Sequence, residues 1–333
     1  MQVKEKTNFF KNIIAMRGMG QVISVSSALV MMCIVFSILN PNFFSGKNIS
    51  NLLRQVVPIL IIGIGQSYVL ITGNIDLSIG SIVGMSCMIS ATLMTRGVNP
   101  WVSALIAMLC CLGMGLISGL LVSKAKLPPF IATLGTMIVA RGIAQISNNN
   151  YNTDAIGEGA RGFRNFFYYG QTLGLFNTVW IGLVVFIFFD FILSRTRTGR
   201  HIYAIGSNIE ASKLSGVNVV FTTTIVYIIS SFCAALVGLI TTATGGLGTM
   251  DAGNGYELNA VAASVIGGVS TLGGQGILLG TVVGSFIWGV LNNGLQFAGA
   301  PVAIRNIVIG IVVVVAVLID IIARTGKVKK AKE

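Results

Sequence analysis

Long runs of apolar residues, separated by short polar segments, cover most of this chain. The runs are continuous rather than alternating, which favours helices over strands. About 20 such residues cross the roughly 30 Å hydrocarbon core of a bilayer. Ten spans are predicted, of which the eighth is the weakest: residues 21–39, 54–72, 76–95, 101–123, 128–147, 175–194, 221–243, 257–270, 275–297 and 302–322. Because a backbone in lipid must satisfy its own hydrogen bonds, the pattern predicts an all-α polytopic membrane protein.

Composition agrees with this fold class. The 333 residues are 54% hydrophobic and 10% charged, with a mean hydropathy of +0.85, which excludes a soluble globular domain. The net charge of +12 comes from basic residues scattered over short loops without interleaved aromatics, so it predicts membrane topology rather than nucleic-acid binding. The basic residues are denser at both termini and in the central loop. We therefore expect one transmembrane domain over residues 1–333, with cytoplasmic tails at 1–20 and 323–333 and a cytoplasmic loop at 195–218.

Cysteine and glycine usage refines the picture. The chain has five cysteines and all of them lie in apolar runs, so neither a disulfide framework nor a metal site is expected. The chain also has 41 glycines, and three pairs have the G-x-x-x-G spacing that lets helix backbones approach closely in lipid: Gly80 with Gly84, Gly115 with Gly119, and Gly280 with Gly284. The sequence therefore predicts a tightly packed bundle of many helices.

The most polar interior segment runs from Arg195 to Asn218. Within it, Ser207 and Glu210 have the spacing of a capping box, and Gly216 follows where a left-handed helix stop is expected. The pattern predicts a short helix, Asn208 to Ser215, held on a loop as a docking surface for a soluble partner. The alternative is a basic loop that only fixes topology.

Polar residues at membrane depth are costly, so each one is a candidate for function. The candidates for a translocation path fall in three groups: Gln66; Asn74, Asp76 and Ser78; and Asn292, Asn293 and Gln296. Asp76 and Ser78 are equally well explained as residues that start a helix. The three amides, read as lying in mid-span, are expected to face the bundle interior, where they bond another helix or line a polar path.

Two loops are expected on the outer side. The segment 147–174 is long and rich in Asn, Gly and Tyr, and is either a platform for a partner or a mobile connector. The segment 244–258 is too rich in glycine to be helical, and either flanks a substrate entrance or forms a turn.

Several motifs are absent from the sequence. It contains no G-x-x-x-x-G-K-[ST] phosphate loop, no H-E-x-x-H and no G-x-S-x-G, so no catalytic residue is predicted. A transporter built on this chain would have to obtain its energy from another polypeptide or from an ion gradient.

Three stretches carry a resemblance to a known family. They are TGNIDLSIGSIVG at 72–84, TGRHIYAIGSNIEASKLSGVNV at 198–219, and ELNAVAASVIGGVSTLGGQGILLGTVVG at 257–284, the last followed by Asn293-Gly294-Leu295. Together they resemble the permease subunits of bacterial monosaccharide ABC importers of the ribose, xylose, arabinose and galactose group, over essentially the whole chain. Asn74, where glycine is commoner, and Ser212, where alanine is commoner, depart from the family pattern.

The resemblance implies a ten-helix bundle similar to the vitamin B12 permease, multi-pass in the bacterial inner membrane. It implies that the loop 198–218 couples the permease to a cytoplasmic ATPase, through Gly199, Arg200, Ala204, Gly206, Asn208, Glu210, Ala211, Ser215 and Gly216. Its other implied partners are an extracytoplasmic sugar-binding protein, a second permease copy or paralogue, a ribose-like pentose or hexose, and membrane lipid. No cofactor is expected on this chain, because the partner uses the ATP.

Two other functions stay open at this point. The first is an ion-coupled secondary sugar transporter with Asp76 as the coupling group, which predicts uptake by the chain alone under an ion gradient. The second is a structural membrane protein, which predicts that deletion leaves uptake unchanged.

Overall fold

The computed structural model describes residues 19–312, 314, 315 and 318. Its elements in chain order are α2 (Met19–Leu39), η1 (Pro41–Phe44), α3 (Gly46–Ile71), α4 (Ile79–Thr95), α5 (Pro100–Ser123), α6 (Pro129–Ile146), η2 (Glu158–Ala160), α7 (Arg161–Arg164), η3 (Asn165–Tyr169), β1 (Gln171–Thr172), β2 (Leu175–Phe176), α8 (Asn177–Arg195), α9 (Arg197–Ser207), α10 (Ile209–Leu214), α11 (Val219–Gly245), α12 (Tyr256–Ile266) and α13 (Leu278–Phe297). A further apolar helix covers Val302–Val312. The two short strands pair as a hairpin, and the fold is otherwise all-α, as predicted.

Every predicted span overlaps a helix, but the helices differ in length. Seven helices in the described part of the chain are long and apolar enough to cross a membrane: α2, α3, α5, α6, α8, α11 and α13. Helix α4 has 17 residues and α12 has 11, so α12 is about 16 Å long and cannot cross by itself. The weak eighth span is therefore a half-length helix, and the far end of the tenth lies outside the described residues.

Helices α3 and α11 form the centre of the bundle. In the most apolar 18-residue stretch of each, 83% of the residues are buried, whereas in α2 only 11% are buried. Helix α2 therefore lies on the surface, packed against α13. Helix α5 packs so closely on α11 that a β-carbon at Gly115 or Gly119 would collide with the α11 backbone. The close packing expected from the G-x-x-x-G pairs is confirmed at this contact.

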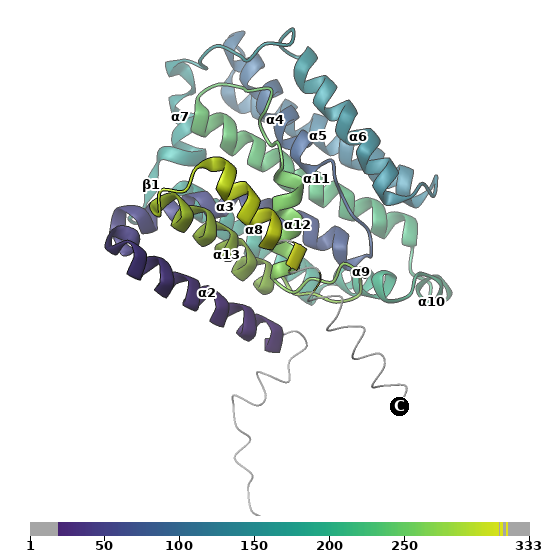
Figure 1. Cartoon of the computed structure of the whole chain (residues 1–333). Coiled ribbons are helices and arrows are strands. Elements are labelled where there is room, and N and C mark those ends of the chain that lie inside the picture. The colour runs from purple at the N-terminus through teal and green to yellow at the C-terminus, as the bar shows by residue number, and fades with distance from the viewer. Residues whose placement is uncertain (1–18, 313, 316–317, 319–333) are drawn as a thin grey trace, which may run out of the picture.

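The bundle has two distinct ends, which Figure 1 shows at the lower right and upper left. Helices α9 and α10 lie at one end, and α7, η3 and the β1–β2 hairpin lie at the other. Helices α8 and α11 connect the two ends: α8 runs from the hairpin to α9, and α11 runs from α10 to Thr244, whose carbonyl oxygen accepts a hydrogen bond from Tyr169 of η3. We refer to these as the α9–α10 end and the α7 end.

Two breaks interrupt the helices inside the bundle. Residues 72–78 separate α3 from α4, and residues 246–255 separate α11 from α12. The second break runs beside α4, because Cys87 contacts the Leu247 carbonyl and a β-carbon at Gly80 would meet the Gly253 carbonyl. The predicted non-helical segment 244–258 is non-helical only at residues 246–255, because its two ends belong to α11 and α12. These residues pack beside α4 and do not form a simple surface turn.

Candidate functional site

The segment 195–218 folds as two capped helices rather than one helix on a loop. Thr196 Oγ1 accepts a hydrogen bond from the Gly199 amide at the start of α9. At the start of α10, Asn208 Oδ1 accepts one from the Ala211 amide at 3.0 Å. Each cap satisfies a backbone N–H that lacks a partner within its own helix. We call α9 and α10 together the α9–α10 knob.

The predicted capping box is wrong. Ser207 is the last residue of α9, and its hydroxyl donates to the Tyr203 carbonyl at 2.9 Å. Glu210 instead forms an exposed ion pair with Lys213 at 2.6 Å, an interaction of a kind that contributes little to stability. Gly216 does adopt the left-handed conformation that was predicted, with φ of +80°.

The predicted coupling residues divide into two sets. Arg200, Asn208, Glu210, Ala211, Ser215 and Gly216 are exposed, whereas Gly199 is buried and Ala204 and Gly206 are half-buried. The glycines are packing residues: a β-carbon at Gly206 would collide with the Ile71 carbonyl, and one at Gly199 would collide with the Leu193 carbonyl. The exposed set can meet a partner, and the packed set joins the knob to the bundle.

The knob rests directly on the break between α3 and α4. Ile71, at the end of α3, lies against Gly206, and its carbonyl oxygen also accepts a hydrogen bond from the Gly274 amide at 2.8 Å. Tyr203 donates a 2.6 Å hydrogen bond to the Gly276 carbonyl oxygen. The knob therefore contacts both the α3–α4 break and the segment between α12 and α13, so a displacement of α9 would act on both.

Two exposed apolar residues on the knob were missed by the sequence reasoning. Leu214 is 91% exposed and Ile209 is 45% exposed, although both belong to a polar segment at an end of the bundle. Their hydrophobicity was visible in the sequence, but the packing that leaves them uncovered was not. Exposed apolar side chains on a rigid helix suit insertion into a groove of another protein.

Asp76 lies inside the bundle, not at a surface helix start. Its side chain is 0% exposed. It belongs to the non-helical segment 72–78 and lies beside Ser230, near the middle of α11. Asp76 Oδ1 accepts from the Ser78 amide and hydroxyl at 2.9 and 2.6 Å, and Oδ2 accepts from the Ser230 hydroxyl at 2.7 Å. Asp76 does not cap α4, which begins at Ile79. Its hydrogen bonds join the α3–α4 break to the central helix.

The neighbouring candidates differ in surroundings. Asn74 bonds only locally, donating to Thr72 Oγ1 at 2.8 Å. Gln66 is 0% exposed on α3, and neither of its side-chain polar atoms has a hydrogen-bond partner. Because an unpaired buried amide is costly, Gln66 is the most unusual polar residue of the central helices. It does not contact the Asp76 cluster through any hydrogen bond.

The three amides of α13 separate into two roles. They lie in the last two turns of a helix that ends at Phe297, so the mid-span placement was wrong. Asn293 exchanges two hydrogen bonds with Asn48, at 3.0 and 3.1 Å, which fixes α13 against α3. Asn292 and Gln296 instead line a cavity, and Asn292 Oδ1 accepts a 3.0 Å hydrogen bond from Arg305.

This cavity, which we call the inter-helix cavity, lies toward the α7 end of the bundle. Its volume is about 480 Å³. It is lined by the first half of α3, the last turns of α11 and the break that follows them, the start of α12, the second half of α13, and Tyr168 and Arg305. Its aromatic lining residues are Tyr168, Tyr256 and Trp288. This grouping was not predictable from the sequence, because its members lie on separate segments between residues 54 and 305.

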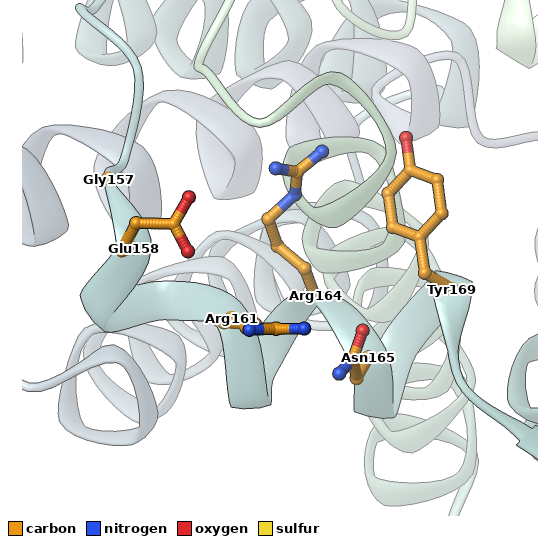
Figure 2. Close-up of a pocket in the computed structure, with 6 residues that line it drawn as sticks. All are labelled: Gly157, Glu158, Arg161, Arg164, Asn165 and Tyr169. Atoms are coloured by element: carbon orange, nitrogen blue, oxygen red, sulfur yellow. The ribbon is translucent and has the colours of Figure 1, made fainter.

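A second cavity of about 480 Å³ is formed by the loop at the α7 end. The predicted long loop 147–174 contains short helices, and Figure 2 shows Arg164 standing between Glu158 and Tyr169. Arg164 Nε donates to the Ala243 carbonyl at 3.1 Å, and its guanidinium lies 5.0 Å from the Tyr169 ring centroid. Arg161 also lines this cavity, and with Glu158 as the acidic lining residue the two arginines leave a net positive charge on a surface that Arg164 joins to α11.

Comparison with known proteins covers most of the chain. Residues 48–317 match the family described as the permease component of the branched-chain amino acid transport system. The ribose import permease protein of Escherichia coli (strain K12) is 37% identical over 294 residues, 88% of this chain and 91% of that protein. The ribose import permease protein of Bacillus subtilis (strain 168) is 37% identical over 303 residues, 91% and 94% of the two chains. The galactose/methyl galactoside import permease protein of E. coli (strain K12) is 34% identical over 296 residues, 84% and 88%.

No solved structure matches the chain. The family match and the relatives nevertheless agree with the multi-helix apolar bundle and extend across both helix breaks and the knob. The chain therefore belongs to this family of transport-system permease components, and the relatives that it resembles within the family are named as sugar import permeases.

Proposed function

We propose that this chain is the permease subunit of an ATP-driven importer that moves a monosaccharide across the bacterial inner membrane. The relatives named for ribose, allose and galactose support a sugar as the substrate. The sequence lacks a phosphate-binding loop, so a separate ATPase subunit hydrolyses the ATP and this chain binds none itself.

The ATPase docks on the α9–α10 knob. The observation that carries this proposal is that Gly206 of the knob lies against the Ile71 carbonyl of the bundle, while Leu214 and Ile209 of the same knob are exposed. The knob therefore has exposed apolar residues that a partner can bind and a direct contact with the α3–α4 break. A movement of the bound ATPase would pass through the knob to this break. The knob and both termini then lie in the cytoplasm, in agreement with the density of basic residues there.

The α7 end faces outward in this arrangement. The basic surface of Arg161 and Arg164 is suited to an acidic patch on an extracytoplasmic sugar-binding protein, because complementary charge guides docking. A second copy of the permease, or a paralogue, completes the membrane part of the importer.

The alternative of an ion-coupled carrier depends on Asp76. The carboxylate accepts hydrogen bonds from three donors of Ser78 and Ser230 and so has a structural explanation. Asp76→Asn separates the two functions: a carrier would lose all ion-driven uptake, whereas an ATP-driven permease has no ion-driven uptake to lose.

Reconstitution tests the proposal. Proteoliposomes are prepared with the chain alone, with a candidate ABC ATPase subunit added, and with that ATPase and a candidate sugar-binding protein together. We expect labelled ribose or galactose to accumulate only in the third preparation, and only with ATP. Accumulation by the chain alone under a proton or sodium gradient would overturn the proposal.

A further inference from the structure

We propose that the inter-helix cavity is a binding site for the transported monosaccharide within the permease, and that it excludes amino acids. This inference rests on the proposed function and adds a substrate contact to it. The cavity lies at the outward half of the bundle, and its volume of about 480 Å³ falls within the roughly 300–1,000 Å³ typical of small-ligand pockets.

The aromatic residues provide apolar faces for a sugar ring. Trp288 of α13 and Tyr256 of α12 line the cavity, and each is partly buried. Trp288 Nε1 donates to Asn259 Oδ1 at 3.2 Å, which fixes the orientation of the indole. A fixed indole beside polar groups can hold the C–H face of a monosaccharide while neighbouring side chains bond its hydroxyls.

The polar lining residues have hydrogen-bonding capacity to spare. Gln55 and Gln296 line the cavity and make no side-chain hydrogen bond within the described chain. Asn292 uses its oxygen for Arg305, and its amide hydrogens have no partner there. Pro58 also lines the cavity and has no amide hydrogen, so the helix hydrogen bond that the Arg54 carbonyl would receive from residue 58 is missing.

The two arginines add donors that the protein does not use. The guanidinium carbon of Arg54 lies 3.7 Å from the centroid of the Phe176 ring, and the guanidinium group donates a hydrogen bond to Asn51 Oδ1. The Nε of Arg54 is nevertheless buried without a hydrogen-bond partner. Arg305 donates to Asn292, and its Nε is likewise buried without a partner. Each arginine therefore brings to the lining of the cavity a guanidinium group whose five donors are not all used within the described chain.

The charge of the cavity discriminates between ligands. Two guanidinium groups and no acidic side chain are found among the described residues that line it. The carboxylate of an amino acid can pair with a guanidinium group, but no acidic side chain of this lining pairs with its α-ammonium group, and an unpaired ammonium group is unfavourable in a partly buried site. The family description names branched-chain amino acids and the relatives are named for sugars; the cavity favours the sugars.

Tryptophan fluorescence tests the site on the permease alone. The chain has three tryptophans, so W101F/W180F leaves Trp288 as the one reporter. The purified full-length variant is titrated with D-ribose, D-galactose and L-leucine. We expect a saturable change in Trp288 emission with a sugar at up to tens of millimolar and no change with leucine.

Further variants assign the signal to the cavity. Asn292→Leu and Gln296→Ala are each expected to weaken sugar binding roughly three- to tenfold, the effect of one or two lost hydrogen bonds. Gln145→Ala, an exposed amide on α6, is the matched control and should bind as the parent does. Saturation-transfer NMR with the wild-type chain repeats the measurement without any tryptophan substitution.

Each outcome decides the proposal. A saturable sugar signal that the cavity variants weaken supports it. No sugar signal by either method, equal binding of leucine, or full binding by both cavity variants would overturn it. None of these measurements uses the ATPase, so a failure here leaves ATP-driven uptake standing, and a failure of reconstituted uptake leaves the cavity result standing.

Discussion

Tyr203 of α9 donates a 2.6 Å hydrogen bond to the carbonyl oxygen of Gly276, in the segment between α12 and α13. Burial, and next the charge of Asp190, raise the pKa of Tyr203 to about 12, so the hydroxyl keeps its proton at neutral pH. This bond and the Gly206–Ile71 contact are the two links between the knob and the rest of the bundle that the proposed coupling uses.

Removing the hydroxyl of Tyr203 should weaken the attachment of the α9–α10 knob to the segment between α12 and α13. We expect Tyr203→Phe to lower the free energy of unfolding by about 1 kcal/mol, because the Gly276 carbonyl loses its donor. It should also lower ATP-driven uptake more than ATP hydrolysis. Tyr151→Phe is the control, since Tyr151 is largely exposed. Equal thermal unfolding and uptake in the two variants would contradict the link.

Adding one methyl group at Gly206 should disrupt coupling. The β-carbon of Gly206→Ala would collide with the Ile71 carbonyl, so α9 would have to move away from the α3–α4 break. We expect uptake to fall at least about tenfold while membrane insertion is retained. Gly113→Ala is the matched control, because a β-carbon at Gly113 in α5 meets no atom within 4 Å. Normal uptake by Gly206→Ala would show that the close contact is not needed.

The Asn48–Asn293 pair should behave as a coupled unit. Asn293→Leu leaves Asn48 with one hydrogen bond, to Phe43, and should destabilise the protein by about 1–3 kcal/mol. The double variant with Asn48→Leu should cost less than the sum of the two single variants, since neither amide is then left unpaired. Asn306→Leu, at an exposed position, serves as control in the same denaturation series. Strict additivity would argue against the pairing.

Cysteine labelling should place the two ends on opposite sides of the membrane. In a Cys110→Ala background, which removes the exposed native thiol, Lys47→Cys should react with a membrane-impermeant maleimide in intact cells. Lys213→Cys should react only after permeabilisation. Both positions are exposed, so access to solvent is matched. Labelling of Lys213→Cys in intact cells would reverse the topology.

Much of the fold could be predicted because apolar runs report directly on helices in lipid. The cap of α10 could not, since Ser207 and Asn208 are adjacent residues that both favour that position, and packing of α9 decides between them. The half-length of α12 was also hidden, because the glycine-rich segment before it lies inside the bundle. Hydropathy reports how apolar a segment is, and not how far its helix extends across the membrane.

The candidate site was predictable only in part. Asp76 stood out as a charge in an apolar region, but its bond to Ser230 joins residues 154 positions apart. Asn292 and Asn293 are neighbours with the same side chain, and a rotation of about 100° along the helix gives one a cavity and the other a buried partner. Leu214 was indistinguishable from a core leucine until the packing around it was known.

The central claim, that a second polypeptide drives this permease through the α9–α10 knob, is tested most directly by exchanging one exposed leucine. Leu214→Asp is compared with Leu173→Asp in proteoliposomes that contain the ATPase and the sugar-binding protein; Leu214 is 91% exposed on the knob and Leu173 is 86% exposed at the α7 end. We expect Leu214→Asp to abolish ATPase binding and to lower uptake at least about tenfold, because a charge replaces the apolar anchor, while Leu173→Asp keeps ATPase binding. Undiminished ATPase binding and uptake by Leu214→Asp would contradict the account.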